Sequence, residues 1–254
     1  MLAYIAKRDR MREIRERLEA LPTLPARRDL PLAVAALAER LGARPDQPSN
    51  HVRFHQTGVM LSRPDSTPMP FSAEQHMGST DEAFLWRARM GPGRVLQVAD
   101  YLVHGKGGLR VWLGMVLELL RDVDSAPILL GERLRYLAEL PLNPDAILFN
   151  HHLRWSVPDE HTLLVAVGEG DTRVEVRFEL GLEGMIEQVS TRARPYKTSS
   201  GYSMLPWRGR FADYAVYEGR LIPHRAEVGW ELETGYFIYW RGRIDRWEVG
   251  KPRL

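Results

Sequence analysis

The stretch WRGRFADY at residues 207–214 is repeated as WRGRIDRW at residues 240–247, 33 positions further along the chain. Side chains on a strand point alternately to opposite faces of the sheet. Trp207, Gly209 and Phe211 therefore share one face, and the arginines between them point the other way. The repeat is typical of a half-buried strand that the chain uses twice.

In the second copy the same alternation places Trp240, Gly242 and Ile244 on one face and Trp247 on the opposite face. A glycine inside a strand marks a bend, a bulge or the close approach of another group. Because a tryptophan precedes it on the same face, the indole ring can lie over the gap that the glycine leaves. Two strands bent in corresponding places predict a curved sheet, and curved sheets enclose cavities.

The arginines of the repeat allow two interpretations. They are solvated side chains on an exposed face, or they surround the mouth of a cavity, where Arg208 and Arg241 would bind an anionic headgroup or carboxylate. The residues alone leave both open.

Composition limits the possible classes of function. The chain has 254 residues, 44% of them hydrophobic and 27% charged, with a net charge of +2 and no cysteine. These values are ordinary for a soluble globular protein and give no reason to expect nucleic acid as a partner. The lack of cysteine excludes disulfides, thiolate nucleophiles and zinc sites built on sulfur.

The N-terminal region predicts a charged helical arm at residues 1–45. Residues 1–21 form a helix with Met11, Ile14 and Leu18 at helical spacing. Residues 1–28 carry eight Lys or Arg and four Asp or Glu, so this helix either packs on its own domain or contacts an anionic membrane surface. A second helix follows, capped by Asp29, and residues 43–50 form a linker. The first 20 residues have no apolar signal segment and no membrane helix follows, so we expect a cytoplasmic protein.

From residue 46 to 254 the pattern predicts an antiparallel β domain with one inserted helix. The expected strands cover residues 51–60, 71–77, 83–90, 95–103, 108–120, 153–157, 161–167, 172–180, 185–194, 205–217, 220–231 and 236–249. A helix at about 125–140, capped by Ser125 or Asp124, presents Leu130, Leu134 and Leu137, and a loop follows at 141–150. So many consecutive strands must curl or close, and the helix can cover their concave side.

Signals for catalysis or metal binding are few. Glu74 and His76 share one face of a strand about 7 Å apart and could form an acid–base couple, assisted by Glu227 or Arg208. The sequence has no phosphate-binding loop and no serine nucleophile elbow. Because its histidines lack the spacing of metal ligands, we expect no metal and no cofactor.

Several motifs resemble one uncharacterised bacterial family, known only as a domain of unknown function. They are FSAEQ at residues 71–75, FLWRA at 84–88, IPHRAEVGW at 222–230 and the repeated WRGR. The likeness extends over most of residues 20–250 and implies no activity. At the level of topology, the layout is similar to the half-barrel lipoprotein carriers of the bacterial periplasm and to mycobacterial lipid-binding lipoproteins. That resemblance implies a curved sheet with helices on its concave side, where acyl chains are held.

Together these observations predict an α+β, mainly β protein, whose strongly curved antiparallel sheet forms a half-barrel or incomplete barrel with a central helix and an N-terminal helical arm. The leading hypothesis is non-catalytic binding of a hydrophobic or amphiphilic, lipid-like molecule on the concave face. The alternatives are an enzyme that uses Glu74 and His76, and a membrane or protein interaction module that uses residues 1–28. The candidate ligand-lining residues are Trp86, Trp112, Leu134, Trp155, Phe178, Trp207, Trp230 and Trp240, with Arg208 and Arg241 at the headgroup.

Overall fold

The computed structural model describes residues 2–114 and 117–250, the first eight of these by their backbone only. The helices are α1 (Leu2–Glu19), α2 (Leu32–Arg40), α3 (Ala126–Ala138) and α4 (Pro144–Phe149). The strands are β1 (His51–Met60), β2 (Met69–Gly78), β3 (Phe84–Met90), β4 (Leu96–Val103), β5 (Lys106–Leu113), β6 (Leu117–Val123), β7 (Arg154–Asp159), β8 (Thr162–Val167), β9 (Val174–Leu180), β10 (Ile186–Thr198), β11 (Gly201–Tyr217), β12 (Arg220–Leu232) and β13 (Gly235–Val249).

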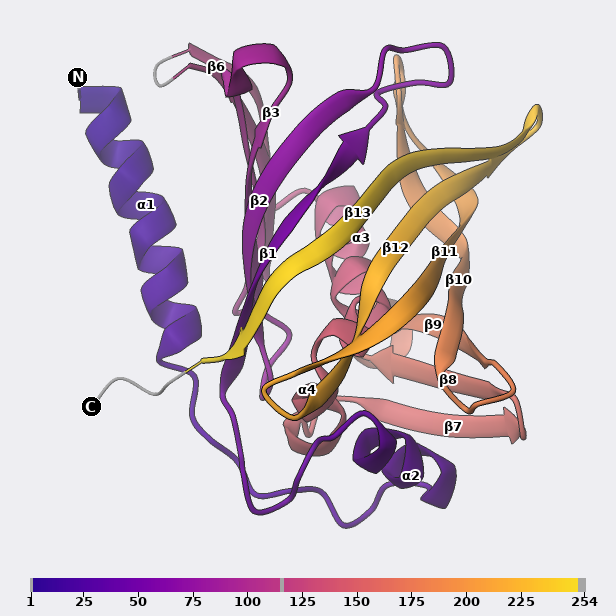
Figure 1. The fold of residues 1–254 in the computed structure, drawn as a ribbon. Helices are drawn as coiled ribbons and strands as arrows, with labels where there is room; N and C mark the ends of the chain where they lie inside the picture. Colours follow the sequence, from indigo (N-terminus) through magenta and orange to yellow (C-terminus); the bar gives the residue numbers. More distant parts are fainter. Residues whose placement is uncertain (1, 115–116, 251–254) are drawn as a thin grey trace.

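Within the described residues the strands form one antiparallel sheet of 13 strands, in the order β6-β5-β4-β3-β2-β1-β13-β12-β11-β10-β9-β8-β7. The first and last strands meet in the middle, where β1 pairs with β13. The sheet curls around α3, and its two edges, β6 and β7, do not pair with each other (Figure 1). This confirms the predicted half-barrel. We call the sheet face turned toward α3 the inner face and the opposite one the outer face.

An extra residue in β13 reverses the predicted orientation of one tryptophan. Where Gln56 pairs with Ile244 and His55 with Arg246, Asp245 has no partner and forms a β-bulge. The bulge shifts the alternation by one residue, so Trp247 turns to the inner face and is buried, while Arg246 is exposed. The prediction that Trp247 lies opposite Trp240 and Ile244 was therefore wrong.

Different side chains occupy the space beside the two glycines of the repeat, Gly209 and Gly242. The ring of Trp240 lies over Gly242, and a Cβ at this glycine would overlap it. The prediction of a tryptophan ring over a glycine is confirmed here. At Gly209 the space is occupied by Val228 and Val189 instead, at 2.8 and 3.2 Å from the position of a Cβ.

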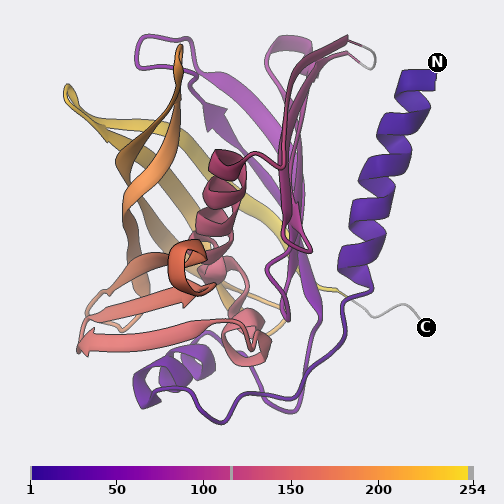
Figure 2. The same cartoon turned by 180° about the vertical axis from the view of Figure 1, so that it is seen from behind.

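Helix α3 lies inside the curve of the sheet, as Figure 2 shows from behind. Ser125 is its N-cap, with the side chain accepting a hydrogen bond from the Ile128 amide at 3.4 Å. Leu134 and Leu137 are buried in the main hydrophobic core against the inner face. The predicted central helix and its apolar face are confirmed.

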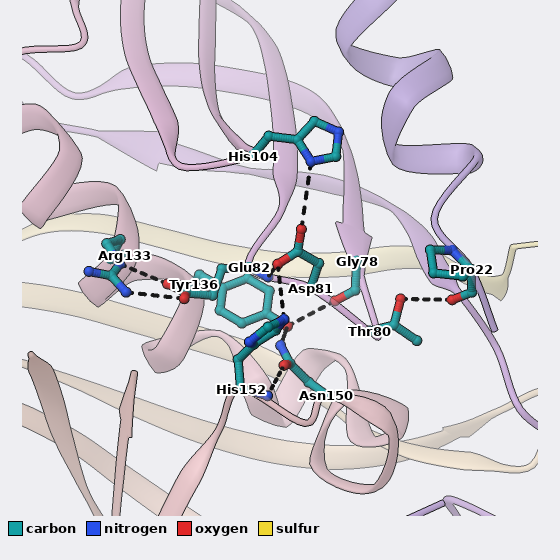
Figure 3. Close-up of polar contacts among 10 residues, drawn as sticks. All are labelled: Pro22, Gly78, Thr80, Asp81, Glu82, His104, Arg133, Tyr136, Asn150 and His152. Carbon is teal, nitrogen blue, oxygen red and sulfur yellow. Dashed lines mark hydrogen bonds and ion pairs between the residues drawn. The ribbon is translucent and has the colours of Figure 1, made fainter. Parts of the chain in front are cut away.

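Polar contacts fix α3 to the turn between β2 and β3 (Figure 3). The Tyr136 hydroxyl donates to the Gly78 carbonyl at 3.0 Å and accepts from Asn150 at 2.9 Å. The Arg133 guanidinium donates twice to the Glu82 carboxylate, at 2.8 and 3.1 Å. Because Tyr136, Gly78 and Asn150 are all buried, these bonds determine where the helix sits in the curve.

The predicted loop at 141–150 is instead a buried helical segment. A 3-10 turn at Leu140–Leu142 leads into α4, and every residue from 140 to 150 is buried. Asp145 of α4 forms an ion pair of 2.7 Å with Arg220 of β12, and both side chains are almost fully buried. Loop residues are ordinarily solvated, and Pro144 at the first helical position favours the helix that forms here.

Helix α1 packs on the outer face of the sheet. Met11, Ile14 and Leu18 form a second hydrophobic cluster with residues of β3, β4 and β5, which include Tyr101 and Trp112. The described part of the apolar face of α1 is therefore covered by its own sheet. No helix among the described residues is long and apolar enough to cross a membrane.

Two further boundaries differ from prediction. The strand expected at 108–120 is the hairpin of β5 and β6, and the chain turns at Gly114, whose φ is +61°. Asp29 does not cap α2. Its carboxylate pairs with Arg27 at 2.8 Å, and the N-cap position is taken by Pro31, which offers no side-chain hydrogen bond. The predicted domain boundary, between a helical arm at residues 1–45 and a β domain at residues 46–254, stays a prediction.

Candidate functional site

A cavity of about 340 Å³ lies between α3 and the inner face of the sheet. Its wall is mainly apolar and includes the tryptophans Trp86, Trp207 and Trp240 and the methionines Met60, Met69 and Met90. Its volume falls near the lower end of the range of about 300–1,000 Å³ that is usual for small-molecule sites. The curvature of the sheet therefore leaves room for a ligand beside the helix.

The tryptophans of the cavity wall are held by neighbours on β1 and β2. Trp86 donates from Nε1 to the side-chain oxygen of Gln56 at 3.0 Å. Phe71 packs edge-on against Trp86, with ring centroids 5.9 Å apart, and stacks on Trp240 at 5.6 Å. The rings are thus oriented before any ligand binds, which lowers the entropic cost of binding.

Arg135 of α3 also lines the cavity, and its guanidinium is hydrogen-bonded to neighbouring side chains. It donates to Asp100, to Glu139 at 2.8 Å and to Gln75 at 3.3 Å. Its guanidinium lies over the Trp86 ring at 5.2 Å. Burial alone lowers the pKa of Arg135, but Glu139 and Asp100 outweigh it and raise the pKa above its ordinary value. Arg135 therefore stays charged, with its carboxylates already in place.

Arg194 of β10 reaches the cavity from the other side. Its guanidinium carbon lies 4.7 Å from the centre of the Trp207 ring and 5.8 Å from that of Trp230. A bulge between Thr191 and Arg194 gives β10 one residue more than β11 in this stretch. The bulge turns Arg194 inward, whereas plain alternation from Thr191 would have pointed it outward. Sequence reasoning missed Arg194 for that reason.

Four of the predicted lining tryptophans lie at or beside the cavity. Trp86, Trp207 and Trp240 form its wall. Trp230 stands next to it, between Tyr239 at 6.0 Å and Tyr196 at 5.1 Å. The structure brings these side chains together from β3, β11, β12 and β13.

The other predicted lining residues lie elsewhere. Leu134 and Phe178 are buried in the main core, and Trp155 stacks on Phe178 with centroids 6.3 Å apart. Trp112 is on the outer face under α1. None of these four lines the cavity, and the core packing that they share gives each its structural role.

The proposed headgroup arginines of the WRGR repeat point to the outer face, opposite Trp207 and Trp240. Arg208 pairs with Glu231 at 2.6 Å and lies over the Tyr236 ring at 4.1 Å. Arg241 pairs with Glu227 at 3.1 Å, and both line a wide, open depression of about 1290 Å³ with charges of both signs. Neither arginine lines the cavity beside α3.

Glu74 and His76 do meet, on the outer face close to the end of α1. His76 Nε2 lies 3.4 Å from Glu74 Oε1 and its Nδ1 lies 3.8 Å from Glu19. The contacts with His76 and Arg87 lower the pKa of Glu74 well below its ordinary value, although burial opposes them. A carboxylate with so low a pKa is a weak general base. Glu227 lies on β12, separated from β2 by two strands, so the structure does not bring it into this pair.

The described part of the chain contains no group of three or more His, Asp and Glu side chains placed to hold a metal ion. Asp81 approaches two histidines, His104 at 3.8 Å and His152 at 4.0 Å (Figure 3). All three side chains are partly or largely exposed. They form a surface ion-pair cluster at the turn between β2 and β3.

Comparisons with solved structures find similar folds at low identity. A LolA superfamily protein from Nitrosomonas europaea is 13% identical, with a TM-score of 0.49 over 87% of this chain and 95% of that chain. A DUF1329 family protein from Desulfovibrio piger is 9% identical, with a TM-score of 0.49 over 87% and 94% of the two chains. A candidate outer membrane lipoprotein-sorting protein domain from Vibrio parahaemolyticus is 9% identical, with the same TM-score over 87% and 92%.

No curated protein matches the chain. A family model, however, matches residues 21–242, which is most of the sequence. The match confirms the resemblance that the aromatic motifs indicated. The chain belongs to DUF6544, a family of unknown function.

Proposed function

We propose that the protein binds a hydrophobic or amphiphilic, lipid-like molecule in the cavity between α3 and the inner face of the sheet, without transforming it chemically. The observation that carries this proposal is an apolar-walled space of about 340 Å³ beside a central helix. Protein interiors are close-packed, and most of their voids hold no more than a water molecule. A space of this size therefore supports a binding site rather than a packing defect.

The chemistry of the wall favours an alkyl chain. Tryptophan rings offer large apolar surfaces, and methionines such as Met60 and Met90 adapt to irregular shapes. Each methylene group that moves from water into such a wall contributes about 0.8 kcal/mol. Because the cavity is small for its class, we infer a single chain rather than a multi-chain lipid.

The polar groups of the wall support binding rather than catalysis. Arg135 forms ion pairs with both Asp100 and Glu139. A general acid or base needs a pKa near the working pH and a free approach to substrate. Because their ion pairs occupy these side chains, they are not free to approach a substrate, whereas they do close one side of a ligand pocket.

The test uses dodecan-1-ol as a neutral single-chain probe, with binding followed by tryptophan fluorescence and calorimetry. Ala226 lines the cavity, and Ala226→Phe places a ring in it. Ala212, exposed and not part of this cavity wall, provides the matched control, Ala212→Phe. We expect Ala226→Phe to weaken binding by about tenfold or more and Ala212→Phe to leave it within about twofold. A wild-type protein that binds no probe, or equal binding by both variants, would refute the proposal.

A further inference from the structure

The charged side chains of the cavity wall differ in their partners. Asp100, Arg135 and Glu139 form ion pairs with one another. Arg194 has no carboxylate within 4.0 Å among the residues that the structure describes, and its one hydrogen bond is a 3.5 Å contact with the Gly131 carbonyl. Of the two arginines in the cavity wall, Arg194 is therefore the one with N–H groups that have no acceptor in the described structure.

The position of Arg194 is nevertheless well defined. Trp207 and Trp230 both lie against its guanidinium, and aromatic faces attract cations. These rings hold the guanidinium plane without using its N–H groups, of which arginine has five. Such a fork matches the paired oxygens of a carboxylate or phosphate.

The acidic residue of α3, Glu132, forms no ion pair with Arg194 within 4.0 Å. Glu132 is 6% exposed, and its Oε2 has no hydrogen-bond partner. Burial raises the pKa of Glu132 well above its ordinary value and Asp100 acts in the same direction, although the charges of Arg135 and Arg194 oppose them. Since Glu132 takes up none of the guanidinium N–H groups of Arg194 at ion-pair distance, these donors can meet another acceptor at the cavity.

We propose that Arg194 binds the oxyanion headgroup of a single-chain amphiphile whose alkyl chain lies in the cavity against Trp207 and Trp240. This inference rests on the proposed function and adds the ligand class to it, a fatty-acid-like carboxylate or a monoalkyl phosphate. Arg194 is half-buried, so a bound headgroup remains in reach of solvent while the chain is covered. A charged headgroup at this place explains why an arginine without an ion pair faces an apolar cavity.

The test compares four probes that carry a twelve-carbon chain, namely dodecanoate, dodecyl phosphate, dodecan-1-ol and dodecyltrimethylammonium, on the chain of 254 residues. For the wild type we expect the anions to bind about tenfold or more tightly than the alcohol, as for a charge-assisted hydrogen bond, and the ammonium probe to bind worst. Whichever of dodecanoate and dodecyl phosphate binds with the lower dissociation constant identifies the preferred headgroup, a carboxylate or a phosphate. Arg194→Gln should remove the preference for anions and leave the affinity for the alcohol within about twofold. Arg192→Gln, at an exposed arginine two residues away, should keep the preference.

The possible failures are distinguishable. If the wild type binds the alcohol as tightly as the anions, or if Arg194→Gln keeps the preference, this inference is wrong while the proposed function stands. If no probe binds the wild type, both this inference and the proposed function are wrong. Binding of the alcohol also reports whether Arg194→Gln is folded. Should that variant not fold, Arg194→Lys keeps the charge but loses the fork, and it must then show a smaller preference for anions than the wild type.

Discussion

At the scale of the residue, single extra residues in strands decide which side chains face the cavity. The bulge at Asp245 turns Trp247 inward, and the bulge before Arg194 does the same for the arginine. A shift of one position moves every later side chain to the other face. The polar and aromatic composition of the inner face thus depends on a few local irregularities.

Gly242 offers a direct test of close approach at this scale. Because the Trp240 ring occupies the place of its Cβ, Gly242→Ala should displace the ring and lower the free energy of unfolding by about 1–3 kcal/mol, the usual cost of overpacking. Gly131 in α3 has nothing within 4 Å of its Cβ position. As the control, Gly131→Ala should raise stability by up to about 1 kcal/mol through helix propensity. Urea denaturation measures the free energy of unfolding of both variants. Equal changes in Gly242→Ala and Gly131→Ala would argue against the packing explanation.

His51 predicts a pH dependence of stability. Burial, followed by the nearby charge of His76, lowers the pKa of His51 from 6.5 to about 4. Between these values the unfolded chain binds a proton that the folded protein resists, so stability is lost as the pH falls from about 6.5 to about 4, by roughly 2–3 kcal/mol. His51→Gln removes this group. Denaturation curves at several pH values should show the gap between wild type and variant narrowing toward pH 4, and parallel profiles would contradict the assignment.

At the scale of the element, buried polar contacts connect helices to distant strands. Asp145 of α4 binds Arg220 of β12 at 2.7 Å, and its second oxygen accepts from Ser49 at 2.6 Å. Trp247 of β13 donates to the Leu142 carbonyl at 2.8 Å. The segment at residues 140–150 is held in this way beneath the curve of the sheet, where it supports α3.

The Asp145–Arg220 pair should be costly to break. Arg220→Met leaves Asp145 buried without its cation, for which a loss of about 3–5 kcal/mol is expected. The pair between Asp213 and Arg225 has a similar distance, 3.0 Å, but is exposed. Arg225→Met should therefore cost about 1 kcal/mol or less. Chemical denaturation of the two variants distinguishes these outcomes, and a small effect at Arg220 would show that the buried pair contributes little.

The packing of α1 can be measured through Leu18, which is fully buried against the outer face. Leu18→Ala should lower the free energy of unfolding by about 2–5 kcal/mol if α1 belongs to the folded domain. Leu32 of α2 is 89% exposed, and Leu32→Ala should change stability by less than about 0.5 kcal/mol. A negligible effect at Leu18 would instead favour α1 as an arm that leaves the sheet to make contacts elsewhere.

At the scale of the whole molecule, the open half-barrel and its central helix create the cavity together. The sheet curls without closing because β6 and β7 stay apart, and α3 fills part of the space between its two halves (Figures 1 and 2). The cavity is the part of this space that α3 does not fill. Its wall comes from strands β1 to β5 on one side and β10 to β13 on the other.

A ligand that joins these two halves should stabilise the whole fold. With dodecanoate at 100 times its dissociation constant, mass action predicts an increase of about 2.7 kcal/mol in the free energy of unfolding. Ala226→Phe should lose most of this increase, and Ala212→Phe should keep it. Calorimetric unfolding with and without ligand measures the effect, and the same increase in Ala226→Phe would place the ligand outside the cavity.

The sequence alone determined the elements that depend on local patterns. Alternation and turn residues predicted most strands, Ser125 and the leucine spacing predicted α3, and the number of consecutive strands predicted a curled sheet. It also indicated Trp86, Trp207 and Trp240, because large aromatic side chains on an apolar strand face pack toward the interior. These features follow from neighbours along the chain.

Only the tertiary structure decided which face each side chain takes after a bulge and which distant groups meet. It placed Arg194 at the cavity, Arg208 and Arg241 outside it, and Trp112 beneath α1. It also buried residues 141–150 through the partnership of Asp145 with Arg220. The physical reason is that bulge positions and long-range ion pairs depend on the pairing of strands far apart in sequence, which local periodicity does not encode.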